Sequence, residues 1–316
     1  MDIILKPQML PQHLETAVED AKQFIRGRHA ESTRRAYAAD LLNFEDWVRA
    51  NGLVSLPATP DIVALYLSQQ AIQGKKPATL TRRLAAIRHL HLAAGHANPT
   101  DAEAVKAVMA GIRRSQGSVQ RQVAPATSDV VQAMMLTCDG SLKGLRDKAV
   151  LALGFGGAFR RSELAKLTLS DIEKTEQGFR VRVLRSKTDK EGRGQFVPVL
   201  DGLRIQVKTS LTDWLQAAKI TEGWLFRSIG KSSVVGTSLT DRSIADIIKA
   251  RATAAGLDPR KFSGHSLRSG FLTSAAMSGA SLFKMMEVSR HKKVDTVQGY
   301  IRFADHFKEH AGREFM

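Results

Sequence analysis

Four short segments in the second part of the chain carry residue types that can handle a phosphodiester. Arginine side chains can stabilise the negative charge that develops on phosphate oxygens during phosphoryl transfer. Histidine and lysine can accept or donate protons, and a tyrosine hydroxyl can act as a nucleophile. The residues are Arg160 and Glu163 in GAFRRSEL, Lys187 in RSKTD, His265 and Arg268 in GHSLRSG, and His291 and Tyr300 in SRHKKVDTVQGY.

The spacing within two of these segments indicates one shared site. Arg160 and Glu163 are three positions apart, and so are His265 and Arg268. Residues at this spacing lie on one face of a helix, so each pair can point toward one centre. Both pairs are therefore candidates for the same site.

The last segment needs a change of direction to join them. His291 and Tyr300 are nine positions apart, which on one continuous helix would separate them by roughly 13 Å. Asp295 with Thr296 supplies an N-cap signal for a new helix. We therefore expect a break after His291 that lets Tyr300 fold back beside it.

The elements around these residues are predicted to be mainly helical. Residues 13–117 show helical periodicity with turn signals, which predicts a small helical bundle. Residues 114–127 are typical of a linker, and a second domain is expected from residue 128. In that domain 179–187 and 195–200 form a hairpin, and helices are expected over 203–217, 240–255, 265–278, 282–288 and the C-terminus. The N-terminal helices are expected near 13–28, from Ser32 or Thr33 to Gly52, from Thr59 and Pro60, from Lys75 to Gly95, and from Thr100 and Asp101.

The helix expected from Lys75 to Gly95 has an apolar face and a basic face. The apolar face holds Leu80, Leu84, Ile87 and Ala94. A basic face with short side chains between its cations suits the DNA major groove, where Arg reads guanine and Thr or Ala meets the thymine methyl group. An ordinary solvated face is the alternative. The candidate DNA-binding residues are Lys75, Lys76, Thr79, Arg82, Arg83 and His89, with Ala86 on the same face.

The composition favours a soluble nucleic-acid-binding protein. Lys and Arg total 47 against 31 Asp and Glu, and the net charge is +16. Residues 1–113 carry +3 and residues 114–316 carry +13, an excess typical of proteins with a polyanionic partner. Neither a membrane span nor a secretory signal is expected. The single Cys138 agrees with a reducing compartment, so a cytoplasmic location is expected.

The candidates for phosphodiester chemistry resemble, in order and spacing, the R…K…H-x-x-R…H…Y residues of the tyrosine recombinases, the integrase family of DNA strand-exchange enzymes. They are Arg160, Lys187, His265, Arg268, His291 and Tyr300. TLTRRLAAIRHLHLAAG, NPTDAEAVKAVMAGIRR and GYIRFADHFKEHAG resemble the Cre-like branch, so the likeness runs from about residue 20 to the end. It implies a SAM-like core-DNA-binding domain over 1–113, a linker over 114–127, and an α+β catalytic domain over 128–316.

The resemblance also implies residue roles and partners. Tyr300 would be the nucleophile that forms a 3′-phosphotyrosyl bond, without metal or cofactor. Double-stranded DNA with inverted-repeat half-sites and a homotetramer on two sites are implied, with the helix after Tyr300 docking on a neighbouring protomer. Arg160 and Arg268 would stabilise the phosphate, Lys187 would protonate the 5′-oxygen, His265 would be the base, His291 would bond the phosphate, and Glu163 would orient its neighbours.

The sequence departs from the family pattern next to both histidines. Ser266 stands where Asp is common, and Ser289 with Arg290 stands where Leu-Gly is common. Arg290 is expected either to contact phosphate or to face solvent. The alternatives in function are a partner-dependent Xer-like recombinase, a type IB topoisomerase and a non-catalytic DNA-binding protein.

Overall fold

The computed structural model describes residues 17, 20, 30–117, 123–184 and 194–304 of the 316-residue chain. The chain divides into two compact units, 1–121 and 122–316. Lys187, most of the helix expected near 13–28 and the segment after Ala304 lie outside the described residues. No helix among those described is long and apolar enough to cross a bilayer.

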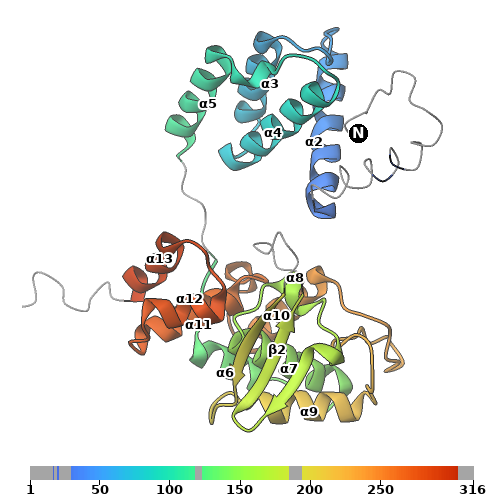
Figure 1. The fold of residues 1–316 in the computed structure, drawn as a ribbon, viewed down its shortest axis with the longest axis vertical. Coiled ribbons are helices and arrows are strands. Elements are labelled where there is room, and N and C mark those ends of the chain that lie inside the picture. Colours follow the sequence, from blue (N-terminus) through green and yellow to red (C-terminus); the bar gives the residue numbers. More distant parts are fainter. Residues whose placement is uncertain (1–16, 18–19, 21–29, 118–122, 185–193, 305–316) are drawn as a thin grey trace, which may run out of the picture. The chain divides into compact units, whose positions relative to one another are not determined.

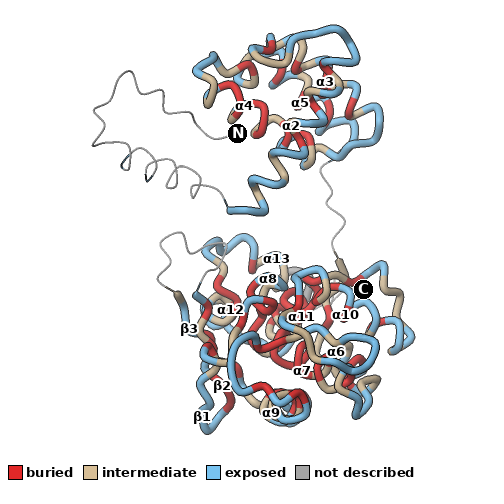
Figure 2. Tube along the Cα trace, turned by 90° about the vertical axis from the view of Figure 1, so that its right-hand side faces the viewer, coloured by how far each residue is buried: buried red, intermediate tan, exposed pale blue. Residues whose placement is uncertain are grey.

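The N-terminal unit is a helical bundle, drawn in blue and teal in Figure 1. Helix α3 packs on α5, and α2 packs on α4. Phe44, Tyr66 and Leu67 are buried at the centre of the unit, and its buried segments face one another in Figure 2. The elements are α2 (Glu31–Ala50), α3 (Pro60–Ile72), α4 (Pro77–Ala93), the 3-10 turn η2 (Pro99–Asp101) and α5 (Glu103–Gln116).

Three helix starts in this unit differ from the sequence expectation. Helix α4 begins at Pro77, after the N-cap Lys76, rather than at Lys75. Helix α2 begins after Ala30, which gives no side-chain cap, so neither Ser32 nor Thr33 is the N-cap. The segment at Thr100 forms η2, and α5 begins after Ala102. By contrast, the Thr59 hydroxyl accepts the Ile62 N–H at the start of α3, as its position before Pro60 indicates.

The linker expected over residues 114–127 is shorter than predicted at both of its ends. Helix α5 continues to Gln116. The N–H groups of Ala124 and Ala126 donate to the carbonyls of Lys261 and Ser266, at 2.7 and 2.9 Å, so this stretch is bound to the second unit. A Cβ on Gly270 would lie 1.7 Å from the Ala126 carbonyl oxygen, so this close approach requires glycine.

The second unit combines helices with a small antiparallel sheet, which confirms the expected fold class. The described sheet has the order β1-β2-β3, with Val181 of β2 opposite Ile172 of β1 and Val197 of β3. Strand β1 (Ile172–Thr175) was not expected; the hairpin of β2 (Gly178–Val183) and β3 (Gln195–Leu200) was. The sheet lies against α7 (Leu142–Gly156) and α9 (Val207–Ala217) (Figure 1).

The remaining helices of this unit carry or support the candidate site. Helix α11 contacts α12 and α13, and all three appear in orange to red at one end of the unit (Figure 1). Leu272, Met285 and Val297 form a small core between them, against which Tyr300 packs. The elements are α6 (Ser128–Leu136), α8 (Arg161–Leu164), η3 (Leu169–Asp171), α10 (Asp241–Ala254), η4 (Pro259–Lys261), α11 (Ser266–Met277), α12 (Leu282–Ser289) and α13 (Val294–Ala304).

Candidate active site

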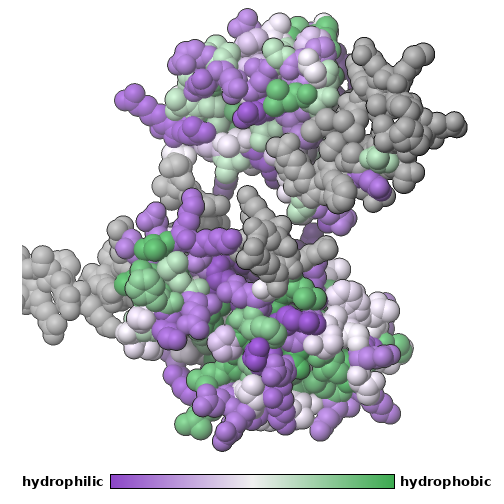
Figure 3. Space-filling view, viewed as in Figure 1, coloured by the Kyte–Doolittle hydropathy of each residue, from purple (hydrophilic) through white to green (hydrophobic). Residues whose placement is uncertain are grey.

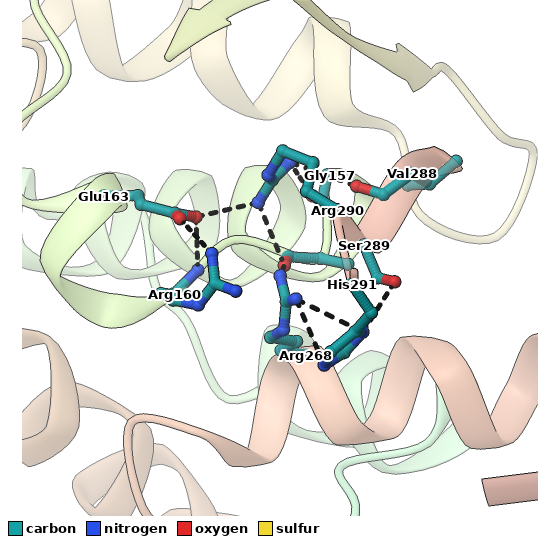
Figure 4. Close-up of polar contacts among 9 residues, drawn as sticks. Gly157, Arg160, Glu163, Arg268, Val288, Ser289, Arg290 and His291 are labelled. Atoms are coloured by element: carbon teal, nitrogen blue, oxygen red, sulfur yellow. Dashed lines mark hydrogen bonds and ion pairs between the residues drawn. The ribbon is translucent and has the colours of Figure 1, made fainter. Parts of the chain in front are cut away.

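Arg160 and Glu163 face each other at the start of the short helix α8 (Figure 4). Arg160 is the N-cap residue, and its backbone N–H donates to Glu163 Oε2 at 2.9 Å. Its guanidinium Nη1 donates to Oε1 of the same carboxylate at 2.6 Å. This geometry follows from the three-residue spacing, because an N3 glutamate can return to the N-cap N–H. Glu163 therefore fixes the orientation of the Arg160 side chain.

Arg268 lies fully buried in the first turns of α11. Its Nη1 donates to the Ala158 carbonyl at 2.8 Å, and its Nη2 lies 3.3 Å from both ring nitrogens of His291 (Figure 4). Burial, with the positive charges of Arg160 and Arg290, lowers the pKa of Arg268 to about 9. The group stays cationic at neutral pH, in a place that favours an incoming anion.

His291 lies in the turn between α12 and α13, as the expected break requires. Its Nδ1 is 2.8 Å from the Ser289 hydroxyl oxygen. Burial and the nearby charges of Arg268 and Arg160 lower the pKa of His291 to about 3. The ring is therefore neutral near pH 7 and can donate a hydrogen bond without adding another positive charge.

Tyr300 is brought to the same place by α13. Its hydroxyl oxygen lies 3.3 Å from Nε2 of His265, which precedes the first residue of α11. Burial raises the pKa of Tyr300 more than Arg268 lowers it, so the phenol keeps its proton at neutral pH. Burial and the charges of Arg268 and Arg160 lower the pKa of His265, so a neutral imidazole faces that phenol. This pair can pass a proton from oxygen to nitrogen.

The structure thus brings six of the seven candidates for phosphodiester chemistry into one cluster. Three pairs make up this cluster. Arg160 bonds to Glu163, Arg268 contacts His291, and the Tyr300 hydroxyl lies beside His265. Two cationic guanidinium groups, two neutral imidazoles and a protonated phenol can bind a phosphate and supply a nucleophile with its base. The seventh, Lys187, lies outside the described residues.

One residue in contact with this cluster differs from the sequence expectation. Arg290 neither faces solvent nor is open to a phosphate, because its side chain is 1% exposed and forms a 2.7 Å ion pair with Glu163 (Figure 4). The sequence held one signal of an unusual role for Arg290: it stands directly before His291, where the family commonly has glycine. Arg161, next to Arg160, is half exposed and pairs with Asp241 at 3.3 Å.

The candidate DNA-reading face of α4 is only partly exposed. Lys75, Lys76 and Arg82 are exposed, and Thr79 and His89 are partly so. Arg83 is buried, however, where its Nη1 donates to the Tyr66 hydroxyl at 2.9 Å and also contacts Gln70, so it does not belong to the outer face. The face drawn in Figure 3 shows mainly hydrophilic side chains on this unit.

Other details of α4 change the expected face further. Ala86 is fully buried rather than exposed. Arg82 donates from Nε and Nη2 to the buried carboxylate of Asp40, at 2.7 and 3.0 Å. Sequence reasoning also missed Arg88, which is exposed one turn before the end of the helix. The outward cations are therefore Arg82 and Arg88 within this helix, with Lys76 at its N-cap and Lys75 directly before it.

Comparison with known proteins identifies the family. Residues 126–306 match the model of the phage integrase family, and residues 22–98 match the phage integrase N-terminal SAM-like domain. The chain belongs to the phage integrase family of tyrosine recombinases. The family match covers all six clustered residues of the site, from Arg160 to Tyr300.

Individual relatives of this phage integrase family member cover most of its length. It is 38% identical over 298 residues to the "integrase/recombinase xerD homolog" of Selenomonas ruminantium, covering 92% of this chain and 87% of that protein. It is 25% identical over 280 residues to "recombinase cre" of Escherichia phage P1, covering 82% of this chain and 80% of that protein.

The fold of this family member also matches solved structures. The site-specific recombinase XerH, bound to its palindromic difH substrate in a post-cleavage complex, has a TM-score of 0.68 and 17% identity. The match covers 96% of this chain and 85% of that one. At this identity the likeness shows the shared fold.

Proposed function

We propose that this phage integrase family member is a site-specific DNA recombinase that cleaves and rejoins strands through Tyr300. The observation that carries the proposal is the 3.3 Å approach of the Tyr300 hydroxyl to His265 Nε2. Arg268 lies close enough to both to lower the pKa of each. A nucleophile, its base and a phosphate-binding cation thus meet at one point.

In the cleavage step, the Tyr300 oxygen forms a bond to phosphorus as the bond from phosphorus to the 5′-oxygen breaks. His265 accepts the phenolic proton, and Lys187 gives a proton to the departing 5′-oxygen. The products are a 3′-phosphotyrosyl bond and a free 5′-hydroxyl. The new bond keeps the energy of the broken diester, so a 5′-hydroxyl from another strand can reverse the step without a nucleotide cofactor.

The remaining residues of the cluster act on the phosphate. Arg160 and Arg268 stabilise the charge on its non-bridging oxygens, and their guanidinium forks fit that geometry without a metal ion. The neutral ring of His291 donates a hydrogen bond to the same group. Glu163 holds Arg160 at the angle set by its two bonds to that residue.

Strand exchange further requires DNA recognition and assembly. We propose that α4 contacts the major groove through its outward cations, and that two protomers bind inverted-repeat half-sites. Two such sites would be joined in a homotetramer linked by the segment after Tyr300. The palindromic substrate in the XerH complex supports the half-site arrangement. The DNA partner and the single Cys138 favour action in the cytoplasm.

The test begins with isolation of a target site, because binding and cleavage can be separated at Tyr300. Tyr300→Phe is used to enrich duplexes from a random library, and the selected site is rebuilt with a nick that lets the cleaved end diffuse away. The wild-type protein should form a covalent adduct on a denaturing gel, in EDTA as well as in magnesium. Mass spectrometry should place the nucleotide on Tyr300.

Other outcomes separate the alternatives. An adduct formed by Tyr300→Phe, or none formed by the wild type on a site it binds, would overturn the proposal and leave a non-catalytic DNA-binding protein in the latter case. Relaxation of plasmids lacking the site, without recombinant product, would indicate a type IB topoisomerase. An adduct without recombination until a second recombinase is added would indicate an Xer-like partner requirement.

A further inference from the structure

The residue before His291 has a backbone conformation that its residue type disfavours. Arg290 follows the end of α12 with φ 59° and ψ 37°, the left-handed region that glycine adopts at many helix ends. A side chain at such a position carries a conformational cost, which persists where surrounding contacts outweigh it. The contacts that offset this cost therefore show what the side chain does.

The Arg290 side chain binds the turn between α7 and α8. Its Nη1 donates to the carbonyls of Gly157 and Val288 at 3.2 and 3.0 Å, and Nη2 donates to Glu163 Oε2 at 2.7 Å (Figure 4). The guanidinium carbon also lies 5.1 Å from the centre of the Phe159 ring. One side chain thus joins the loop that carries His291 to the turn that carries Arg160.

A second strained position lies at the other end of these contacts. Ala158 has φ 45°, also in the left-handed region, and its carbonyl accepts from Arg268 Nη1 at 2.8 Å. The same carbonyl lies 3.4 Å from Arg290 Nη2. Arg290 and Arg268 therefore share one acceptor, in a turn whose backbone could relax if either were absent.

We propose that Arg290 is a positioning residue that fixes both phosphate-binding arginines, Arg160 through Glu163 and Arg268 through the Ala158 carbonyl. This proposal rests on the proposed function, because it assigns Arg160 and Arg268 to the phosphate. Arg290 itself does not touch the phosphate, since its side chain is 1% exposed.

The charge balance gives a second reason for this role. Glu163 is buried and bears one negative charge between Arg160 and Arg290, at 2.6 and 2.7 Å. With both arginines present the group of three carries one net positive charge. Without Arg290 the carboxylate would neutralise Arg160 alone, and the site would lose positive charge where the phosphate binds.

The pKa of Glu163 offers a direct readout of this arrangement. Burial raises it, but the charge of Arg290 and the backbone and side-chain bonds from Arg160 together hold it below the usual value. Removal of Arg290 leaves the effect of burial less opposed. The pKa of Glu163 should therefore rise in an Arg290 variant.

The test compares Arg290→Met and Arg290→Gly with Arg251→Met. Arg251 is the matched control, because it forms a mostly buried 2.7 Å ion pair with Asp147 in the same unit, without contact to the candidate site. At saturating DNA, both Arg290 variants should slow single-turnover cleavage by about 10- to 100-fold, the range a small misplacement of catalytic groups produces. DNA affinity should stay near that of the wild type.

Arg251→Met should lower the melting temperature and leave the cleavage rate of the folded protein unchanged. If Arg290→Gly, which removes both the side chain and the backbone strain, cleaves at the wild-type rate, the positioning role is overturned. Equal slowing by Arg251→Met would also overturn it, because the effect would then follow from lost stability alone.

A double-mutant cycle tests whether Arg290 acts through Glu163. Glu163→Gln and Arg290→Met should each slow cleavage, and the double variant should be no slower than the worse single variant. Multiplicative effects would contradict the connection through Glu163. Arg290→Lys, which keeps the positive charge and one donor nitrogen, should recover part of the rate.

A measurement without DNA keeps this proposal separate from the proposed function. Carbon NMR of the Glu163 carboxyl group in the full chain should show a higher titration midpoint in Arg290→Met than in the wild type, and no change in Arg251→Met. If the wild type forms no DNA adduct, the proposed function fails while this titration still decides whether Arg290 holds Glu163. An unchanged midpoint in Arg290→Met overturns the inference by itself.

Discussion

The hydroxyl oxygen of Tyr300 lies 3.3 Å from Nε2 of His265, 35 positions earlier in the chain. Packing of α13 against α11 brings the two together. Burial raises the pKa of the tyrosine and lowers that of the histidine, so at neutral pH both groups are uncharged before reaction. The proton is therefore on the oxygen, and an acceptor lies within reach.

The pH dependence of cleavage should reflect this pair. His265 must be neutral to accept the proton, and because its pKa is lowered, the midpoint of the fall in cleavage rate at acid pH should lie below pH 6.5. In His265→Ala, the rate at neutral pH should fall about 10²- to 10⁴-fold. It should then rise with pH toward the raised pKa of Tyr300. Single-turnover rates on the nicked site measure both profiles, and a level profile in His265→Ala would contradict the base assignment.

Replacement of the buried arginine should separate catalysis from binding. Arg268→Ala should reduce cleavage by orders of magnitude while DNA affinity changes little, because the guanidinium acts mainly on charge in the transition state. Arg160→Ala should behave alike. Gel shifts and single-turnover cleavage measure the two effects. Because Arg268 is fully buried, circular dichroism must show that the variant is folded; a parallel loss of affinity would indicate a ground-state role instead.

Two arginines five positions apart in α4 should respond in opposite ways. Arg83→Ala should destabilise the protein by about 3 kcal/mol, since it leaves buried polar partners at Tyr66 and Asp40. Arg88→Ala should change stability by less than about 0.5 kcal/mol and weaken DNA binding. Urea unfolding and salt-dependent gel shifts measure these effects. Normal DNA affinity in Arg88→Ala would remove that residue from the interface.

Arg82 is bonded to a buried carboxylate, as Arg83 is, and is exposed on the outer surface, as Arg88 is. Its two hydrogen bonds to Asp40 hold the side chain on the outer surface, where 51% of it is exposed. Arg82→Ala should cost about 1–3 kcal/mol of binding to the specific site and relax base preference there. Selection of sites with the variant tests this, and an unchanged selected sequence would remove Arg82 from base reading.

A pair of glycines tests the close approach between Ala126 and α11. Gly270→Ala should be strongly destabilising, because its Cβ would lie 1.7 Å from the Ala126 carbonyl oxygen. Gly111→Ala is the control, since nothing lies within 4 Å of a Cβ in this interior turn of α5. It should stabilise the protein by roughly 1 kcal/mol. Thermal melting compares them, and similar curves would show that the chain at Ala126 moves aside.

Much of the fold could be predicted from the sequence, because apolar periodicity and capping residues act locally. The hairpin of β2 and β3 alternates apolar and polar residues and was found. Strand β1 was missed, because IEKT is only four residues long and mostly exposed. Its strand conformation depends on pairing with β2, a tertiary contact that a local pattern does not report.

The face of α4 was misread because buried polar residues do not appear in an apolar pattern. Arg83 and His91 are buried by specific hydrogen bonds, to Tyr66 and to the Ala58 N–H. These bonds come from α3 and from the chain that precedes it, so the sequence of α4 alone gives no sign of them. Arg290 escaped prediction for the same reason, as its partner Glu163 is 127 positions away.

The small core of Leu272, Met285 and Val297 bears on which protomer supplies each group of the candidate site. It packs α13, which carries Tyr300, against α11, which carries Arg268, within one chain. Under the proposed function, the nucleophile and the phosphate-binding cation would therefore belong to the same subunit, and each subunit would cut the strand that it holds. In a mixed assembly, a protomer lacking Tyr300 and one lacking Arg268 would not complement each other, since neither could lend its missing group to the other's site.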